Sequence, residues 1–91
     1  MNKLEDWYVV VDNNPNLAPE LLTYRLAGKT HNDPRFENGE NVFTSHIVML
    51  DVGERVAKTK NTTYYLGAPA TAWLEWLFQN NYRLDMYNKK G

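Results

Sequence analysis

Residues 42–66 read VFTSHIVMLDVGERVAKTKNTTYYL, and this stretch predicts the fold. Its first part has a continuous apolar centre at residues 47–50, which is typical of a strand buried on both faces. Turn-forming residues interrupt the stretch twice, around Gly53 and again at residues 60–61. The expected strands are residues 42–52, 55–59 and 62–66. Because short connections join neighbouring antiparallel strands, we expect a three-stranded antiparallel meander here.

Two further strands are expected before this meander. Residues 7–11 are aromatic and β-branched and predict a strand, and residues 23–30 predict a second one. Gly28 within the second strand indicates a bulge or a close approach between backbones. Between these strands, residues 18–22 predict a short helical turn. Residues 31–41 carry turn signals such as Asn38-Gly39 and predict a loop.

After the meander, the pattern changes from strand to helix and back. Pro69 is well placed in the first turn of a helix, which is expected to run to about Gln79 and to stop at Asn80-Asn81. Residues 82–87 alternate apolar and polar side chains and predict a last strand.

The order of these elements indicates a single domain, residues 1–91, of the mainly β class (β-rich α+β). We expect a small antiparallel curved sheet or an SH3-like barrel with one C-terminal helix. A partly open sheet with the helix on one face is the alternative.

Composition limits the classes of function. The formal net charge is −1, which disfavours binding of duplex nucleic acid through a broad basic face. The chain has no cysteine, so disulfides, zinc-thiolate sites and cysteine nucleophiles are excluded. No apolar signal core or run of membrane-spanning length is present, so we expect a cytoplasmic location and no contact with membranes.

Most of the candidate chemistry lies in the loop at residues 31–41 and in the strands beside it. An arginine next to an aromatic ring can hold an anion or a planar base. Hydroxyl, amide and imidazole groups can orient such a ligand. The candidate ligand-binding residues are His31, Arg35, Phe36, Thr44, Ser45, His46, Asn61 and Tyr65. We expect Thr44 and His46 to share one face of their strand, because side chains alternate along strands.

Other interpretations of the same residues are available. The polar side chains could only satisfy backbone groups in turns. A metal-dependent enzyme or hydrolase could use His31, His46 and the loop carboxylates, but their spacing matches no compact ligand motif. We therefore expect no catalytic residue, no metal and no cofactor.

The predicted helix is apolar on more than one face. Trp73, Trp76 and Phe78 cannot all lie on one stripe, whereas a surface helix normally shows a single apolar stripe. We therefore expect some of these three residues to contact a second copy of the chain or a partner protein. The alternative is that the sheet and the C-terminal tail cover the helix.

Residues 26–68 resemble small uncharacterised proteins encoded by phages and mobile elements. The resemblance rests on a pattern in the order glycine, histidine, Arg-Phe, glycine, Thr-Ser and Tyr-Leu-Gly. Its residues are Gly28, His31, Arg35-Phe36, Gly39, Val42, Thr44-Ser45, Ile47-Val48, Thr59, Asn61 and Tyr65-Leu66-Gly67. The segment that often reads His-Pro-Arg in that pattern is interrupted here by Asn32 and Asp33. The resemblance implies a phage or prophage origin and a role against host defence.

These observations lead to two hypotheses of function. The first is a non-enzymatic, oligomeric binding protein that sequesters a nucleotide-like small signalling molecule. In this hypothesis Arg35 pairs with phosphate, His31 and Thr44 donate hydrogen bonds, and Phe36 or Tyr65 stacks on the base. The second hypothesis is a protein–protein interaction module or inhibitor that binds a host defence protein through its aromatic helix.

Overall fold

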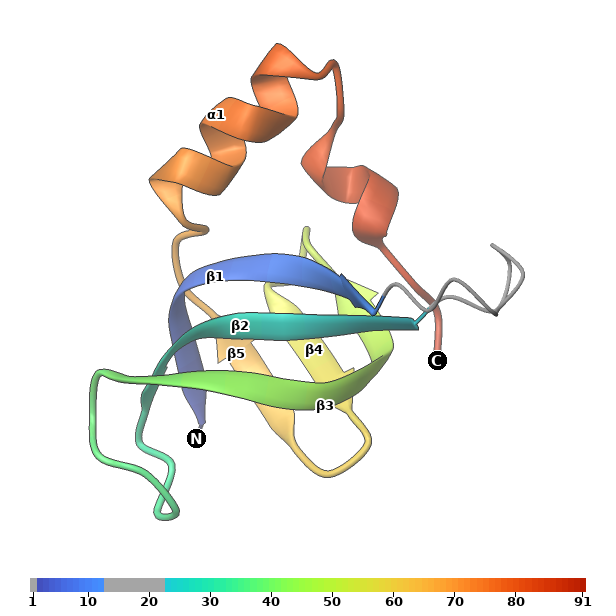
Figure 1. Ribbon diagram of the computed structural model, residues 1–91. Helices are drawn as coiled ribbons and strands as arrows, with labels where there is room; N and C mark the ends of the chain where they lie inside the picture. The colour runs from blue at the N-terminus through green and yellow to red at the C-terminus, as the bar shows by residue number, and fades with distance from the viewer. Residues whose placement is uncertain (1, 13–22) are drawn as a thin grey trace.

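The computed structural model describes residues 2–12 and 23–91, and five strands within these ranges form a closed barrel (Figure 1). The strands are β1 Lys3–Asp12, β2 Thr23–His31, β3 Glu40–Asp51, β4 Val56–Thr59 and β5 Thr63–Leu66. They are followed by the helix α1, Thr71–Gln79, and a short 3-10 helix η2, Leu84–Tyr87. The mainly β, SH3-like barrel with a C-terminal helix is confirmed, and the sheet is closed rather than partly open. The helical turn predicted at residues 18–22 lies outside the described residues.

The barrel closes through a pairing between its first and last strands. Consecutive strands pair antiparallel throughout, which confirms the predicted meander of β3, β4 and β5. In a closed meander with an odd number of strands, the first and last strands run in the same direction. Accordingly β1 and β5 pair in parallel, with Lys3 opposite Tyr65 and Leu4 opposite Leu66. The amide of Gly67 extends this contact by donating to the carbonyl of Leu4 at 2.8 Å.

A bend in β1 makes room for the closure, and Gly28 of β2 accommodates this bend. Asp6 has φ of +50°, and the register between β1 and β2 shifts between Glu5 and Tyr8. A Cβ atom on Gly28 would lie 2.8 Å from the carbonyl oxygen of Glu5 and 2.9 Å from Cγ of Leu4. The close backbone approach predicted at Gly28 is therefore confirmed.

Gly28→Ala is expected to lower the free energy of unfolding by roughly 2 kcal/mol, because the added methyl overpacks against backbone that cannot rotate away. Urea denaturation measures this loss. Gly53→Ala is the matched control, since its Cβ would meet only Oδ1 of Asp51, at 3.4 Å. The control is expected to change stability by less than about 0.5 kcal/mol. Equal effects at the two glycines would contradict the close approach.

The strand β3 is interrupted by irregularities that change which side chains face inward. The register against β2 shifts between Arg25 and Ala27, and the register against β4 shifts between Ile47 and Met49. As a result Ile47 and Leu50 are buried, whereas Val48 is exposed. The prediction that the apolar run 47–50 is buried on both faces is wrong, because the outer side of β3 at Val48 faces solvent.

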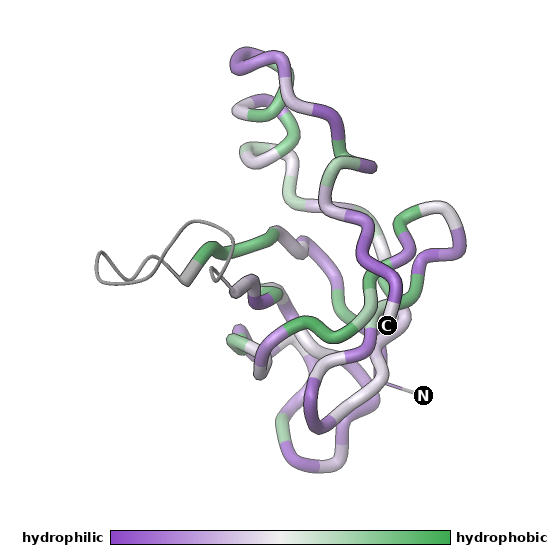
Figure 2. The backbone as a smooth tube through the Cα atoms, turned by 90° about the vertical axis from the view of Figure 1, so that its right-hand side faces the viewer, coloured by the Kyte–Doolittle hydropathy of each residue, from purple (hydrophilic) through white to green (hydrophobic). Residues whose placement is uncertain are grey.

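The core fills the barrel with side chains from all five strands, and Figure 2 shows long hydrophobic stretches along the strands. Trp7, Leu4, Leu26 and Leu50 are its largest fully buried apolar side chains. Trp7 also donates from Nε1 to the carbonyl oxygen of Gly67 at 2.9 Å, so its buried polar atom is satisfied. The indole therefore links β1 to the segment that leads into α1.

The C-terminal part stands on one end of the barrel as a helical hairpin (Figure 1). The helix α1 ends where predicted, because Asn81 has φ of +60° and the amides of Asn81 and Tyr82 donate to the carbonyls of Phe78 and Leu77.

The predicted last strand at residues 82–87 is wrong. Residues 84–87 form η2, a 3-10 turn in which the amide of Met86 donates to the carbonyl of Arg83. The segment reaches a strand only after η2, where Lys89 pairs antiparallel with Leu50 of β3. No helix in the described part of the chain is long and apolar enough to cross a membrane.

Candidate binding site at the open end of the barrel

The loop between β2 and β3 is held in shape by its own polar groups. The amide of Phe36 donates to the carbonyl of Asp33 at 3.0 Å, and the amide of Gly39 donates to Thr30 at 2.7 Å. Gly39 has φ of +85°, a conformation that favours glycine. Oδ1 of Asn38 accepts from the amide of Asn32 at 2.9 Å. The Asn38-Gly39 turn therefore brings the chain back into β3, as the sequence predicts.

An ion pair with a buried carboxylate anchors the half-exposed side chain of Arg35. The side chain of Asp33 is 1% exposed, and it accepts from Nε of Arg35 at 3.0 Å and from Nη2 at 2.8 Å. The amide of Arg35 also donates to Oδ1 of Asp33 at 3.0 Å. These hydrogen bonds from Arg35 hold the pKa of Asp33 below its ordinary value, against the opposing effect of burial. The hydrogen bond with Asp33 raises the pKa of Arg35, so the pair stays ionised.

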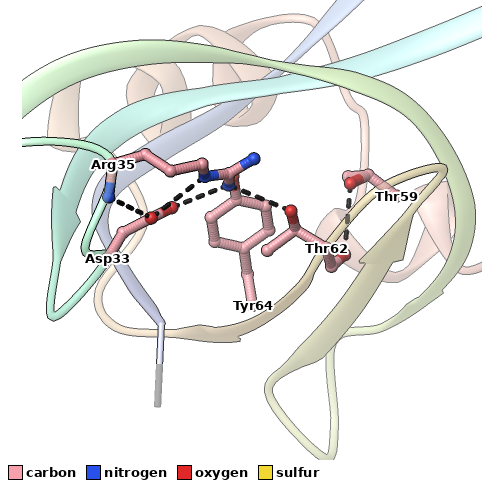
Figure 3. Close-up of polar contacts among 5 residues, drawn as sticks. All are labelled: Asp33, Arg35, Thr59, Thr62 and Tyr64. Carbon is pink, nitrogen blue, oxygen red and sulfur yellow. Dashed lines mark hydrogen bonds and ion pairs between the residues drawn. The ribbon is translucent and has the colours of Figure 1, made fainter.

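The same guanidinium reaches across to the turn between β4 and β5. Nη2 of Arg35 donates to Oγ1 of Thr62 at 3.0 Å and makes a longer contact of 3.5 Å with the hydroxyl of Tyr64 (Figure 3). Oγ1 of Thr59 donates to the carbonyl of Thr62 at 3.1 Å and fixes this turn. Arg35 therefore ties the β2–β3 loop to the β4–β5 turn across the open end of the barrel.

A pocket of about 160 Å³ lies between these two connections and β3. The β2–β3 loop and the β4–β5 turn that flank the pocket lie at the end of the barrel opposite to α1 (Figure 1). Five of the eight predicted ligand-binding residues line it: Arg35, Phe36, Thr44, Ser45 and Asn61. The loop, β3 and the β4–β5 turn therefore bring together residues that are far apart in the sequence.

The other three predicted residues lie elsewhere. Tyr65 is exposed on the outer side of β5, because its neighbour Tyr64 takes the inward position. His46 is exposed and lies 3.1 Å from the guanidinium of Arg25. His31, at the end of β2, does not line the pocket. The expectation that Thr44 and His46 share a face is wrong, because the irregularity in β3 lies close to them and Thr44 is buried while His46 is exposed.

The two hydroxyl groups of the Thr-Ser pair differ in their hydrogen bonds. Oγ1 of Thr44 accepts from the amide of Leu26 at 3.0 Å and donates to the carbonyl of Ser45 at 2.7 Å. Oγ of Ser45 is buried, and it has no hydrogen-bond partner among the described residues. A buried hydroxyl without a partner costs about 1–3 kcal/mol. Ser45 therefore lines the pocket with a buried hydroxyl that no described residue satisfies.

Several residues that form the site are not among the predicted ones, and three of them are Asp33, Thr62 and Phe43. The sequence suggests Asp33 as a turn residue or as one of the loop carboxylates of a metal site, although Asp-x-Arg in a loop can signal a local ion pair. Thr62 belongs to the turn next to Asn61 and reaches the site only because the barrel closes. Phe43 lines the pocket with an exposed ring, 70% accessible, and the alternation along β3 could have found it.

The helix residues predicted as an interface divide between core and surface. Trp73 packs against Trp7 and Tyr87, with ring centroids 5.5 Å apart in both pairs, so it attaches α1 to the barrel. Trp76 stacks at 5.4 Å on Tyr82 and is still 48% exposed. Phe78 is 83% exposed.

Within residues 2–12 and 23–91, no group of three histidine or carboxylate side chains lies close enough to hold a metal ion. A comparison of the chain with protein-family models, with curated proteins and with solved structures finds no match.

Proposed function

We propose that this is a non-enzymatic, phage-type binding protein that sequesters a nucleotide-like small molecule at the open end of its barrel. The observation that carries the proposal is the buried hydroxyl of Ser45, which lines the pocket without a hydrogen-bond partner in the described part of the chain. Such groups in proteins are normally satisfied, and a bound ligand or water would satisfy this one.

The surroundings of Ser45 support a ligand of this class. Asn61 and Arg35 add hydrogen-bonding groups, and Phe36 and Phe43 add aromatic surface. The guanidinium carbon of Arg35 lies 5.4 Å from the ring centroid of Phe36, a cation–π contact that holds both side chains. In the role against host defence, the ligand would be a signalling molecule of the host cell.

Ser45→Ala is expected to weaken ligand retention by about fivefold without reducing stability, because one ligand hydrogen bond is lost and an unpaired buried hydroxyl is removed. Native mass spectrometry of protein incubated with nucleotide second messengers measures the retained ligand. Thermal unfolding without ligand checks the stability, and the melting temperature is expected to stay equal or rise.

Thr63→Ala is the control, since this exposed residue of β5 lies outside the pocket lining. It is expected to retain ligand as the wild type does. A wild-type protein that retains no ligand from any of these mixtures would rule out the sequestration proposal.

We propose a second function on an independent observation, the exposed apolar side chains of α1. Leu74 and Phe78 are exposed and lie four residues apart, so they share one flank of the helix. Glu75 is the only charged residue between Thr71 and Gln79. A second copy of the chain offers the same uncharged, apolar flank, so two copies can pair there without placing like charges in the contact. This proposal corresponds to the expected homo-oligomer.

Phe78→Glu is expected to weaken self-association more than tenfold, because it places an unpaired carboxylate in an apolar contact. Sedimentation velocity across a concentration series measures the effect. Gln79→Glu is the matched control, since it adds the same charge at the next residue, and circular dichroism verifies that both variants fold. A wild-type chain that stays monomeric throughout the series would refute the self-pairing, and a host protein would then be sought as the partner of α1.

A further inference from the structure

We infer that the pocket recognises an uncharged heteroaromatic ring, such as a nucleobase, and that any phosphate of the ligand stays outside it. This inference rests on the ligand-binding function proposed above and specifies which part of the ligand the pocket holds. It replaces the expectation that Arg35 pairs with phosphate.

The positive charge of Arg35 is already balanced by the carboxylate of Asp33. Asp33 occupies both Nε and Nη2 of the guanidinium, at 3.0 and 2.8 Å, and its carboxylate is almost completely buried. Among the described residues that line the pocket, Arg35 is the only charged one. The pocket therefore carries no net positive charge, and a phosphate would have to displace Asp33 or enter without a counter-charge. Both are unfavourable for a desolvated dianion.

The guanidinium still has one nitrogen for a neutral acceptor. Among the described residues, the side-chain hydrogen bonds of Arg35 come from Nε and Nη2, which leaves Nη1 for a ligand. The other hydrogen-bonding groups of Arg35 are used by Asp33, Thr62 and Tyr64. The N–H groups of this nitrogen, whose guanidinium is held by the buried carboxylate of Asp33, suit a carbonyl oxygen, such as those at the edge of a pyrimidine or a purine.

Two of the neutral polar side chains in the lining supply further hydrogen-bonding groups for a ligand. Ser45 has a buried hydroxyl without a partner among the described residues, and Asn61 contributes an exposed amide from the β4–β5 turn. An amide offers both donors and an acceptor, which is the pattern that the edge of a base requires. These groups recognise a ligand through hydrogen bonds and not through its charge.

The aromatic rings and the size of the pocket favour a flat group. Phe36 and Phe43 both line the pocket and are 39% and 70% exposed. Stacking of a base on an aromatic side chain contributes about 1–3 kcal/mol, whichever base is bound. The volume of about 160 Å³ lies below the roughly 300–1,000 Å³ of pockets that enclose a whole drug-sized ligand. The pocket therefore has room for a ring, with the sugar and phosphate remaining at its rim.

The test is a titration followed by two-dimensional amide NMR at constant ionic strength. The probes are uridine, cytidine, adenosine and guanosine, their 5′-monophosphates, and inorganic phosphate. At least one nucleoside is expected to shift the side-chain amide of Asn61 and the backbone amide of Phe43. Its dissociation constant is expected to lie within about threefold of that of its monophosphate, because the phosphate adds little. Inorganic phosphate is expected neither to shift these signals nor to compete.

The possible failures are distinguishable. One outcome is that the monophosphates bind, the nucleosides do not, and inorganic phosphate competes. The pocket would then recognise the charge of the ligand, so the inference would be overturned and the proposed binding function would stand. If neither nucleosides nor monophosphates bind, the inference and the proposed function both fail. A short single-stranded oligonucleotide is included as a further probe. Binding much tighter than that of the nucleoside would confirm ring recognition and identify a nucleic acid strand as the source of the base.

Variants test the two kinds of contact separately. Phe43→Ala is expected to weaken nucleoside binding about tenfold through loss of stacking. Val48→Ala, an exposed position on the same strand but outside the pocket, is the control and is expected to bind normally. Unchanged nucleoside binding by Phe43→Ala would overturn the stacking geometry.

Discussion

Trp7→Ala is expected to lower the free energy of unfolding by about 3–5 kcal/mol, the largest loss from any single substitution considered for this chain. The indole is 2% exposed, so its removal leaves a cavity in the core. It also removes the hydrogen bond to Gly67 and the ring contact with Trp73. Since small domains are stable by only about 5–15 kcal/mol, the variant would be marginally folded. Guanidinium denaturation followed by circular dichroism measures the change.

Two other tryptophan substitutions separate the contributions at Trp7. Trp7→Phe keeps an aromatic ring in the core and loses the indole donor, so it is expected to cost about 1–2 kcal/mol. Trp76→Ala removes a half-exposed ring of α1 and is expected to cost less than Trp7→Ala, in proportion to its smaller burial. Equal losses for Trp7→Ala and Trp76→Ala would show that Trp7 is not part of the core.

Arg35→Met is expected to destabilise the protein by about 2–3 kcal/mol at pH 7. Removal of one partner of a buried ion pair costs roughly 3–5 kcal/mol, and the half-exposed position of Arg35 reduces this figure. The loss arises because the carboxylate of Asp33 stays buried and keeps only the amide of Arg35 as a donor. Urea denaturation at several pH values measures it.

The dependence on pH identifies Asp33 as the origin of the loss. In the wild type the hydrogen bonds from Arg35 lower the pKa of Asp33 from its ordinary value of 3.8. Its ionised form therefore stabilises the fold above pH 3.8, and this contribution is lost as the pH falls through the folded-state pKa. In Arg35→Met burial raises the pKa of Asp33 instead, so its ionisation becomes destabilising. The difference in stability between the two proteins is thus expected to shrink as the pH falls, first between the raised pKa of Asp33 in the variant and 3.8, and then further below 3.8 as the wild type loses its own contribution.

A double substitution completes this test. Asp33→Asn combined with Arg35→Met removes both charges, so the double variant is expected to be more stable at pH 7 than Arg35→Met alone. A double variant as unstable as the single one, with the same loss at every pH, would mean that packing by the arginine stem and not its charge holds the loop.

The strands could be predicted from local patterns because each one carries its own signal. The apolar centre of β3 and the turns that follow it define the meander, and Gly28 marks the close approach of β1. The meander also limits how the sheet can close. By contrast, apolar and polar side chains alternate along residues 82–87 as in a strand, yet this segment is not a strand. Whether a segment pairs with a neighbouring strand depends on the arrangement of the whole barrel. Local sequence contains no information on that point.

The site could be predicted only in part, because residue types are local information and the direction of a side chain is not. Arg35, Ser45 and Asn61 stand out by residue type, and the loop and turn place them at one end of the barrel. The side of β3 on which Thr44 and His46 lie could not be predicted. A single irregularity in β3 reverses the alternation of side chains on which that prediction depends. The partner of Arg35 was only two residues away, yet the burial of Asp33 comes from the tertiary structure.

The parallel pairing of β1 with β5 has a consequence for the order of events in folding. Lys3 and Tyr65 are separated by most of the chain, so their contact closes a long loop and loses more chain entropy than any hairpin in the molecule. Such non-local pairings slow folding, and we expect the meander to form before the barrel shuts. Thr62 and Tyr64, which meet Arg35, adjoin the strand that shuts it. Completion of the pocket would then coincide with the last step of folding, and a molecule bound there would slow the reopening of the barrel.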